Sequence, residues 1–289
     1  MTADRIPTCL GPLIKYIRGL QPQLILRLVN TILFSSRALK TKANPDIRSI
    51  LDVSNRECSS LHIGLFAGDF WKQLWYSTKD KIPRELNWKR YHFSTKSGPN
   101  RHALSSCYQD LWEFPKQLLE SIKVLGGSGL SELLDTYIES KPIIAGFWKV
   151  IGKSYRKITY FLDKEDKTRV IAICDYWSQT VLRPLHLYLF KALKKIPQDM
   201  TFDQEAFKTH LDSWDIFYSI DLKSALDRFP IELISKVLMA HLPVTYVKAW
   251  RDIMVGYPFD YNGKKISYAV GNPMGATHHG LPILLLTII

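Results

Sequence analysis

The chain has 289 residues, of which 46% are hydrophobic and 12% aromatic, and it carries a formal net charge of +12. This composition excludes an intrinsically disordered protein, a collagen-like protein and a small domain held together by disulfides. No apolar run reaches the roughly 18 residues that a membrane-spanning helix needs, so we expect no stable membrane insertion. The four cysteines, at positions 9, 58, 107 and 174, form no CxxC pair, which favours separate core thiols over a zinc site.

The positive charge is concentrated in the first half of the chain. Residues 1–157 carry 24 Lys and Arg against 13 Asp and Glu, whereas residues 158–289 carry 15 against 14. A basic half beside a balanced half favours a polyanion-binding surface next to a site that needs carboxylates. A soluble protein with one basic face is the alternative. The length allows two domains, which we place at residues 1–155, basic and mainly helical, and 156–289.

The first 42 residues contain seven basic residues and a single acidic one, Asp4. This composition fits an import-type presequence, and it fits equally well the first basic helix of the fold. Further along, residues 68–114 interleave aromatic and basic side chains, among them Lys89, Arg90 and Arg101. Such a mixture suits stacking on bases and holding phosphates. Aromatic core residues beneath a solvated charged face would give the same pattern.

Short turn signals follow in chain order. Residues 96–101 read as an exposed turn, and the glycines of residues 126–129 as a connector between two short helices. After residue 157, hydrophobic periodicity predicts strands at 158–162, 169–174 and 216–221, and helices at 177–196, 231–241 and 246–255. Pro184 kinks the first of these helices or marks its start.

Two features near the end of the chain define the predicted fold. Asn262-Gly263 lies between two short strand-like runs and predicts a hairpin with a type I′ turn. Helices and strands together predict an α+β fold. The strand at 216–221 ends on Asp221, and the turn that follows it delivers Asp227.

Asp221 and Asp227 lie six residues apart. Nucleotidyl transfer needs carboxylates that hold two Mg²⁺ ions about 4 Å apart. It also needs a polar group that tests the sugar 2′-hydroxyl, which distinguishes RNA from DNA building blocks. Taken alone this pair is a weak signal, because caps and surface turns produce such pairs constantly.

With its flanks, this stretch becomes specific. The region from about Lys157 to Leu286 resembles the RNA-directed RNA polymerases of mitoviruses, small positive-strand RNA elements of mitochondria. The resemblance rests on ordered motifs at matching spacing: Lys167-Thr-Arg169, Asp175 to Gln179, Leu182 to His186, Asp199 to Gln204, Asp221 to Pro230 and Tyr268 to Ala276. The first 150 residues resemble the family only loosely.

The resemblance implies a right-hand polymerase with a helical N-terminal region, fingers and palm. It implies Mg²⁺ or Mn²⁺, an RNA template, nucleoside triphosphates and a mitochondrial location. Lys167 and Arg169 match the fingers motif that meets the incoming triphosphate, which suits a point charge and a bidentate guanidinium. The other matched positions are Asp221 as the first metal-binding aspartate, Asp227 as the ribose sensor, and Gly271 and Gly275 in the flexible loop that seats template and nucleotide.

Four further matched positions have a structural role in this reading. Asp175, His186, Asp203 and Gln204 match family positions without a part in the chemistry. We expect His186 to be a core histidine with its polar atoms satisfied. We expect Asp203 to cap a helix that runs on through Phe207.

Several positions depart from the family pattern. Lys223 and Leu226 stand where small polar residues are usual, so a hydroxyl is missing beside the predicted ribose sensor. Asn272 replaces a glutamine of the second loop, and His278 and His279 replace two serines. Imidazoles are bulkier than hydroxyls and place their donors elsewhere.

The family's next motif is a hairpin that carries Gly-Asp-Asp and completes the metal site, but no Asp or Glu follows Asp260 here. A missing metal carboxylate costs on the order of several kcal/mol, and each 1.36 kcal/mol is tenfold in rate. We therefore expect a C-terminally truncated polymerase with an incomplete palm and no thumb, inactive as it stands, of viral origin or integrated in a host genome. Residues 281–289 would then form an exposed apolar end.

Two alternatives stay open. The first is a non-catalytic RNA-binding remnant of a viral polymerase. The second is a reverse transcriptase fragment, which the absence of Tyr-x-Asp-Asp and the motif order disfavour. In the polymerase reading, Asp227 lies beside Asp221 with the 271–275 loop across from both, and Lys167 and Arg169 approach the same cleft. At least one carboxyl group then has a raised pKa, because like charges repel.

Overall fold

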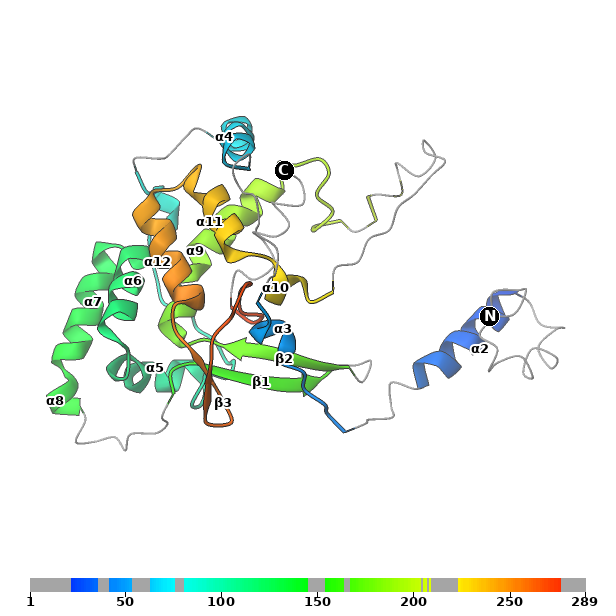
Figure 1. Ribbon diagram of the computed structural model, residues 1–289, viewed down its shortest axis with the longest axis horizontal. Helices are drawn as coiled ribbons and strands as arrows, with labels where there is room; N and C mark the ends of the chain where they lie inside the picture. Colours follow the sequence, from blue (N-terminus) through cyan, green and yellow to red (C-terminus); the bar gives the residue numbers. More distant parts are fainter. Residues whose placement is uncertain are drawn as a thin grey trace. The chain divides into compact units, whose positions relative to one another are not determined.

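The structure is a computed structural model that describes residues 22–35, 42–53, 63–75, 81–144, 154–163, 167–203, 205–206, 208 and 223–276. The chain divides into two compact units. The first unit comprises residues 1–45 and 160–169, and the second comprises residues 46–159 and 170–289. Helices and strands are both present, so the predicted α+β class is confirmed (Figure 1).

Most of the described secondary structure is helical. The helices are α2 (Pro22–Ser35), α3 (Arg48–Leu51), α4 (Ile63–Leu74), α5 (Ala103–Trp112), α6 (Lys116–Gly126), α7 (Ser128–Glu139), α8 (Lys141–Ile144), α9 (Tyr176–Leu193), α10 (Ala225–Arg228), α11 (Ile231–Met239) and α12 (Val244–Val255), with the 3₁₀ helix η3 (Arg84–Leu86). α2 lies within the basic first 42 residues and contains a single basic residue, Arg27.

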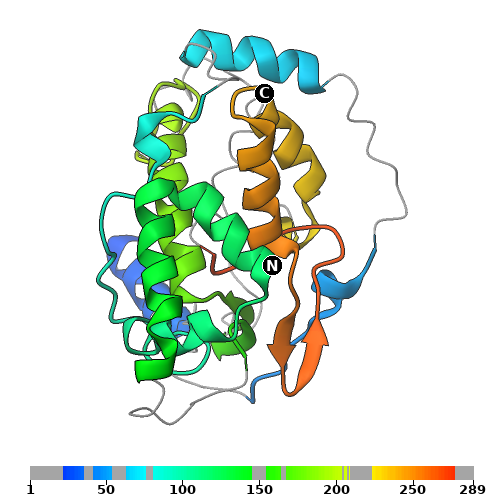
Figure 2. The ribbon, with the colours of Figure 1, turned by 90° about the vertical axis from the view of Figure 1, so that its left-hand side faces the viewer.

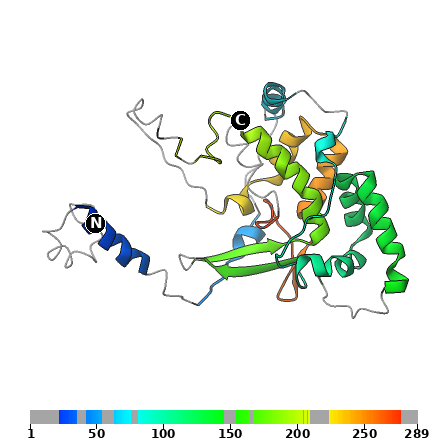
Figure 3. The ribbon, with the colours of Figure 1, turned by 180° about the vertical axis from the view of Figure 1, so that it is seen from behind.

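The strands are β1 (Lys157–Leu162), β2 (Thr168–Ile173), β3 (Phe259–Tyr261) and β4 (Lys264–Ile266). They form one sheet in the order β2-β1-β3-β4, in which β1 runs parallel to β3 and β3 antiparallel to β4. β1 and β2 lie side by side (Figure 3). Asn262 and Gly263 both have positive φ, 53° and 82°, as a type I′ turn requires. The two strands at 158–174 and the hairpin are confirmed.

The core of the second unit is helical. α9 packs against α5, α6 and η3, and α6 runs against α12 (Figure 2). Buried tryptophans find main-chain acceptors: the Trp177 indole donates to the Cys107 carbonyl and the Trp71 indole to the Val237 carbonyl, both at 2.9 Å. The helices predicted at 177–196, 231–241 and 246–255 are confirmed as α9, α11 and α12, with small shifts at their ends.

The start of α9 shows the role of Asp175 and corrects one of the two predictions made for Pro184. Asp175 is the N-cap, because its buried carboxylate accepts the Ser178 N–H at 2.7 Å. Asp175 is therefore structural, as expected. Pro184 lies inside the helix, so a helix start at Pro184 is wrong. The capped first turn lies well before the proline and sets the boundary.

Three smaller predictions have mixed outcomes. α6 ends at Gly126 and α7 begins at Ser128, with Gly127 at φ +78°, so the glycine connector is confirmed. In the turn at 96–101 the ends are exposed, but Gly98 and Pro99 are buried. Full exposure of that turn was therefore wrong. The physical reason is that the Asn100 amide donates to the buried Asp110 carboxylate at 2.6 Å and holds the turn inward.

The remaining structural expectations concern single side chains. The Asp203 carboxylate accepts the Glu205 N–H at 3.0 Å, the contact expected of an N-cap. His186 is half-buried and meets Phe190 edge to face. Cys107 and Cys174 are separate buried thiols, as predicted. Several predicted features lie outside the described residues: Gln204, Phe207, the strand at 216–221, and residues 277–289 with His278 and His279.

Candidate functional site

The predicted ribose sensor and the predicted loop lie together in the second unit. Main-chain hydrogen bonds join them: the Gly271 N–H donates to the Asp227 carbonyl at 3.1 Å and the Asn272 N–H to the Leu226 carbonyl at 2.9 Å. A Cβ at position 271 would overlap both of these carbonyl groups. Only glycine permits so close an approach of two backbones. The turn that carries Asp227 and the loop are therefore packed directly against each other.

Gly275 fixes the other end of the loop. Its φ of +116° lies in the region that favours glycine, and a Cβ there would overlap the Ala172 carbonyl oxygen. The neighbouring Met274 carbonyl accepts the Ala172 N–H at 2.6 Å, and the Gln179 amide donates to the Gly275 carbonyl at 3.0 Å. The loop is thus held between the Asp227 turn, β2 and α9.

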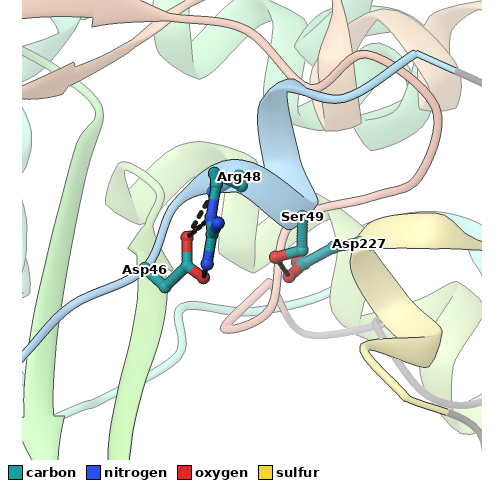
Figure 4. Close-up of polar contacts among 4 residues, drawn as sticks. All are labelled: Asp46, Arg48, Ser49 and Asp227. Carbon is teal, nitrogen blue, oxygen red and sulfur yellow. Dashed lines mark hydrogen bonds and ion pairs between the residues drawn. The ribbon is translucent and has the colours of Figure 1, made fainter.

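The Asp227 side chain has a partner that the sequence did not suggest. The Ser49 hydroxyl donates to its Oδ2 atom at 2.7 Å (Figure 4). Ser49 lies in the single-turn helix α3, 178 positions away in the chain. A lone serine in a four-residue helix with no motif around it carries no signal from which this contact could have been predicted.

Burial dominates the electrostatics of Asp227. It raises the pKa of the half-buried carboxyl group, while the Ser49 hydrogen bond and the positive charge of Arg228 lower it. The predicted rise in pKa is confirmed, although its largest cause is burial. The expected repulsion by Asp221 concerns a residue outside the described part of the chain.

The segment Asp46 to Val53, which we name the strap, packs against this site. Ile50 is 1% exposed, and its carbonyl accepts the Ala269 N–H at 3.0 Å, just before the loop. The Arg228 guanidinium donates to the Asp52 carbonyl. The strap therefore contacts both the turn that carries Asp227 and the chain that leads into Gly271, and α3 and α10 lie side by side (Figure 1).

An ion pair shapes the outer side of the strap. The Arg48 guanidinium contacts both carboxylate oxygens of Asp46, with Nε–Oδ1 2.9 Å and Nη2–Oδ2 2.6 Å (Figure 4). Asp46 Oδ1 also accepts the Arg48 N–H at 3.0 Å. These bonds to Arg48 lower the pKa of Asp46 to about 2. They shape the turn that precedes Ser49.

Lys167 and Arg169 belong to the first unit. The Arg169 Nε donates to Asp163 Oδ2 at 2.7 Å, and the Lys167 N–H donates to Asp163 Oδ1 at 3.0 Å. The Arg169 side chain is 44% exposed. The Asp163 side chain is only 15% exposed, so this ion pair is partly buried. The Lys167 side chain extends into solvent.

A groove of about 1120 Å³ lies between residues 85–93 and the outer face of α9, which we name the basic groove. Its lining includes Lys89, Arg90, Phe93, Arg183 and Leu187. The Phe93 side chain is 81% exposed and that of Leu187 50%. Lys89 and Arg90 are exposed and form no ion pair within the described part of the chain.

A neutral histidine orients one cation of the basic groove. The Arg183 guanidinium contacts the His92 ring, where its Nη1 atom meets Nδ1 and lies 3.3 Å from Nε2. Burial, and then the charge of Arg183, lower the pKa of His92. The ring therefore stays uncharged near neutral pH and can accept a hydrogen bond from Arg183. Lys191 at the far end is paired with Glu85 at 2.8 Å.

The predicted aromatic and basic stretch therefore has two parts. Lys89 and Arg90 line the basic groove, whereas Arg101 is exposed outside it. Trp71 is buried and stacks on His241 with ring centres 4.4 Å apart, so the alternative of core aromatics holds there.

Within the described residues, no three His, Cys, Asp or Glu side chains gather where they could hold a metal ion. No helix in the described ranges is long and apolar enough to cross a membrane. Asp221 lies outside these ranges.

Comparison with known proteins agrees with the sequence motifs. Residues 84–287 match the model of the mitovirus RNA-dependent RNA polymerase family. Over 138 residues, 45% of this chain, the sequence is 37% identical to the RNA-directed RNA polymerase of Cryphonectria parasitica mitovirus 1 (strain American chestnut tree/New Jersey/NB631), and the match covers 17% of that relative. No solved structure matches. Since the family model covers more than half of the chain, the chain belongs to the mitovirus RNA-dependent RNA polymerase family.

Proposed function

We propose that this chain provides nucleotide- and template-binding parts of a right-hand RNA-directed RNA polymerase, from the fingers and the first part of the palm. The parent reaction transfers a nucleoside monophosphate to an RNA 3′-hydroxyl. The observation that carries the proposal is the pairing of the Asp227 turn with the Gly271 loop, in a member of this family. The two glycines let the loop pack against the protein's own carbonyl groups, and the loop thereby supports the turn that carries the Asp227 carboxylate, an acceptor suited to a ribose hydroxyl.

The proposed roles follow the motif positions. Lys167 and Arg169 contact the triphosphate, Asp227 accepts a hydrogen bond from the ribose, and Gly271 and Gly275 seat the nucleotide against the template. Polymerases of this family use divalent metal ions, and Asp221 would hold Mg²⁺ or Mn²⁺ in this chain. Among the described residues, no three His, Cys, Asp or Glu side chains gather as possible metal ligands.

The basic groove is the proposed path of an RNA strand. Lys89, Arg90 and Arg183 supply three positive charges for phosphates, and Phe93 exposes a ring on which a base can stack. Such a surface binds single strands without reading their sequence. Lys89 and Arg90 thus give two of the positive charges in the first half of the chain a proposed role in binding RNA.

The remaining assignments are proposals of the same kind. A relative encoded by a mitovirus supports a mitochondrial location. We assign residues 1–155 to the helical N-terminal and fingers region and residues 156–289 to fingers and palm. The 289 residues contain no Asp or Glu after Asp260. Taken alone they would bind RNA and nucleotide without extending a primer, which is also what a non-catalytic RNA-binding remnant would do.

One experiment tests these assignments together. The purified chain is incubated with a primed RNA, Mn²⁺ and labelled ribonucleoside triphosphates, and nucleotide retention and primer extension are measured in parallel. We expect retention that depends on RNA and is lost in Asp227→Ala, without extension. Extension that Asp221→Ala abolishes would refute the proposed inactivity and support the polymerase assignment. Absence of nucleotide and RNA binding at 50 mM salt would refute the assignment itself.

A further inference from the structure

The Ser49 hydroxyl is the one side-chain donor to the Asp227 carboxylate within the described residues. We propose that Ser49 is a positioning residue for Asp227, and that the strap therefore takes part in selecting ribonucleotides. This inference rests on the proposed function, in which Asp227 senses the ribose. Ser49 lies outside residues 84–287, which match the family model.

The geometry divides the two oxygens of the carboxylate between two tasks. Ser49 donates to Oδ2 at 2.7 Å, and no side chain of the described residues donates to Oδ1. A single donor on one oxygen fixes the rotation of the carboxylate and leaves the other oxygen as an acceptor for a ribose hydroxyl. Because an ionised carboxylate only accepts hydrogen bonds, the Ser49 donor also favours the charged form that the ribose needs.

The strap can position Ser49 because it is fixed on both sides. Ile50, the next residue, is buried, and its carbonyl is bonded to the Ala269 N–H ahead of the loop. Two residues further on, the Asp52 carbonyl accepts from Arg228, the neighbour of Asp227. Before Ser49, the Asp46–Arg48 ion pair shapes the turn. The serine is thus held by the same two segments that form the nucleotide site.

Within the described ranges, few charged and titratable groups interact with Asp227. Arg228, on the same turn, lowers the pKa of Asp227, as does the Ser49 hydrogen bond, whereas burial raises it. In the chain before the loop, burial and then the charge of Asp227 raise the pKa of Tyr268, which stays neutral. Loss of the Ser49 donor should therefore raise the pKa of Asp227, by about one pH unit for a hydrogen bond to a charged group.

The test uses the full 289-residue chain and two readouts. The first is a titration of the Asp227 carboxyl carbon by NMR in aspartate-labelled protein, with the signal assigned from its absence in Asp227→Asn. The variants are Ser49→Ala and the nearly isosteric Ser49→Cys, whose thiol is a weak donor, and Ser49→Thr, which keeps the hydroxyl. The matched control is Ser106→Ala, which removes a serine hydroxyl bonded to Asp110 at 3.0 Å in the core.

The second readout is competition of ATP and 2′-deoxy-ATP for the chain with bound RNA and Mn²⁺. We expect Ser49→Ala and Ser49→Cys to raise the pKa of Asp227 and to lower the preference for ATP by about tenfold. Ser49→Thr should keep both properties, and Ser106→Ala should change neither. A purely structural serine would lower the melting temperature of the variants without changing the preference for ATP.

The two readouts separate failure of this inference from failure of the proposed function. If the pKa of Asp227 and the preference for ATP are the same in Ser49→Ala, Ser49→Cys and the parent chain, the positioning role is refuted while nucleotide binding stands. If the parent chain binds neither nucleotide, the proposed function is refuted, and the ribonucleotide selection inferred here falls with it. In that case an unchanged titration would refute the positioning of the carboxylate as well.

Discussion

The Asp227 site is built mainly from the main chain, whereas the basic groove is built mainly from side chains. The site is built from main-chain hydrogen bonds and from two glycines that no other residue can replace without overlap. The groove is lined by exposed side chains, among them Lys89, Arg90 and Phe93. A backbone-built site should fail abruptly when one atom is added, whereas a side-chain surface should weaken in steps.

The largest expected effect is that of Gly271→Ala. The added methyl group would overlap the Leu226 and Asp227 carbonyls, so the loop must separate from the turn. We expect a loss of about 3 kcal/mol in the free energy of unfolding and a fall in Tm of about 6–12 °C. Nucleotide binding should be lost as well. Differential scanning calorimetry measures the first effect.

The matched control for this substitution is Gly129→Ala. Gly129 lies in α7 with nothing within 4 Å of an added Cβ, so alanine should leave the stability unchanged or raise it by up to about 1 kcal/mol. Equal losses in the two variants would contradict the close approach at position 271.

The next effect concerns the cations of the basic groove. Replacing Lys89, Arg90 and Arg183 together by alanine should weaken binding of a single-stranded RNA on the order of tenfold. The log–log dependence of affinity on salt should become shallower by about 2, at about 0.7 per phosphate contact. Fluorescence anisotropy across a salt series measures both quantities. The control replaces three exposed lysines outside the groove, Lys116, Lys248 and Lys264, and an equal loss there would refute a localised path.

A smaller effect is expected for the exposed ring in the groove. Phe93→Ala should lower RNA affinity by about fivefold, because stacking of one base contributes about 1 kcal/mol or more. The salt dependence should stay the same, since no charge changes. Phe66, 64% exposed in α4, offers the control: the same affinity loss in Phe66→Ala would indicate a general effect of exposed rings.

The smallest effect is the pH dependence that arises from His92. Its pKa is lowered in the folded chain by burial and by Arg183, so the unfolded chain takes up a proton first as the pH falls through about 6.5. The contribution of His92 to stability is therefore present above that pH and is lost below it. His92→Gln should reduce the fall in stability between pH 7 and pH 5.5, measured by urea unfolding. An unchanged pH dependence would contradict a neutral, half-buried ring.

The difference between the two regions also explains what could be predicted from the sequence. The Asn262-Gly263 turn and the helix α9 are local features, because backbone preference and periodicity decide them within a few residues. The pairing of Asp227 with Gly271 followed only from the family resemblance. The resemblance placed the glycines in a loop that seats template and nucleotide, and the structure shows that they approach the protein's own carbonyl groups.

Contacts between side chains that are far apart in the sequence could not be predicted from it. Ser49 and Asp227 are 178 positions apart, and His92 and Arg183 are 91 positions apart, without any motif at one end that requires the other. The core position of Trp71 and the inward turn at Gly98 depend on packing, which periodicity over a few residues does not reveal. Such pairs become visible only when the fold brings them together.

The most direct measurement is photo-crosslinking of an azido-ATP to the chain with RNA and Mn²⁺, followed by mass spectrometric mapping. The account predicts label on peptides that contain Asp227, the 271–275 loop or Lys167 and Arg169, with labelling that requires RNA and is competed by ATP more strongly than by 2′-deoxy-ATP. Label confined to other peptides, or labelling at these positions that is independent of RNA and of the ribose 2′-hydroxyl, would contradict a polymerase nucleotide site in this chain.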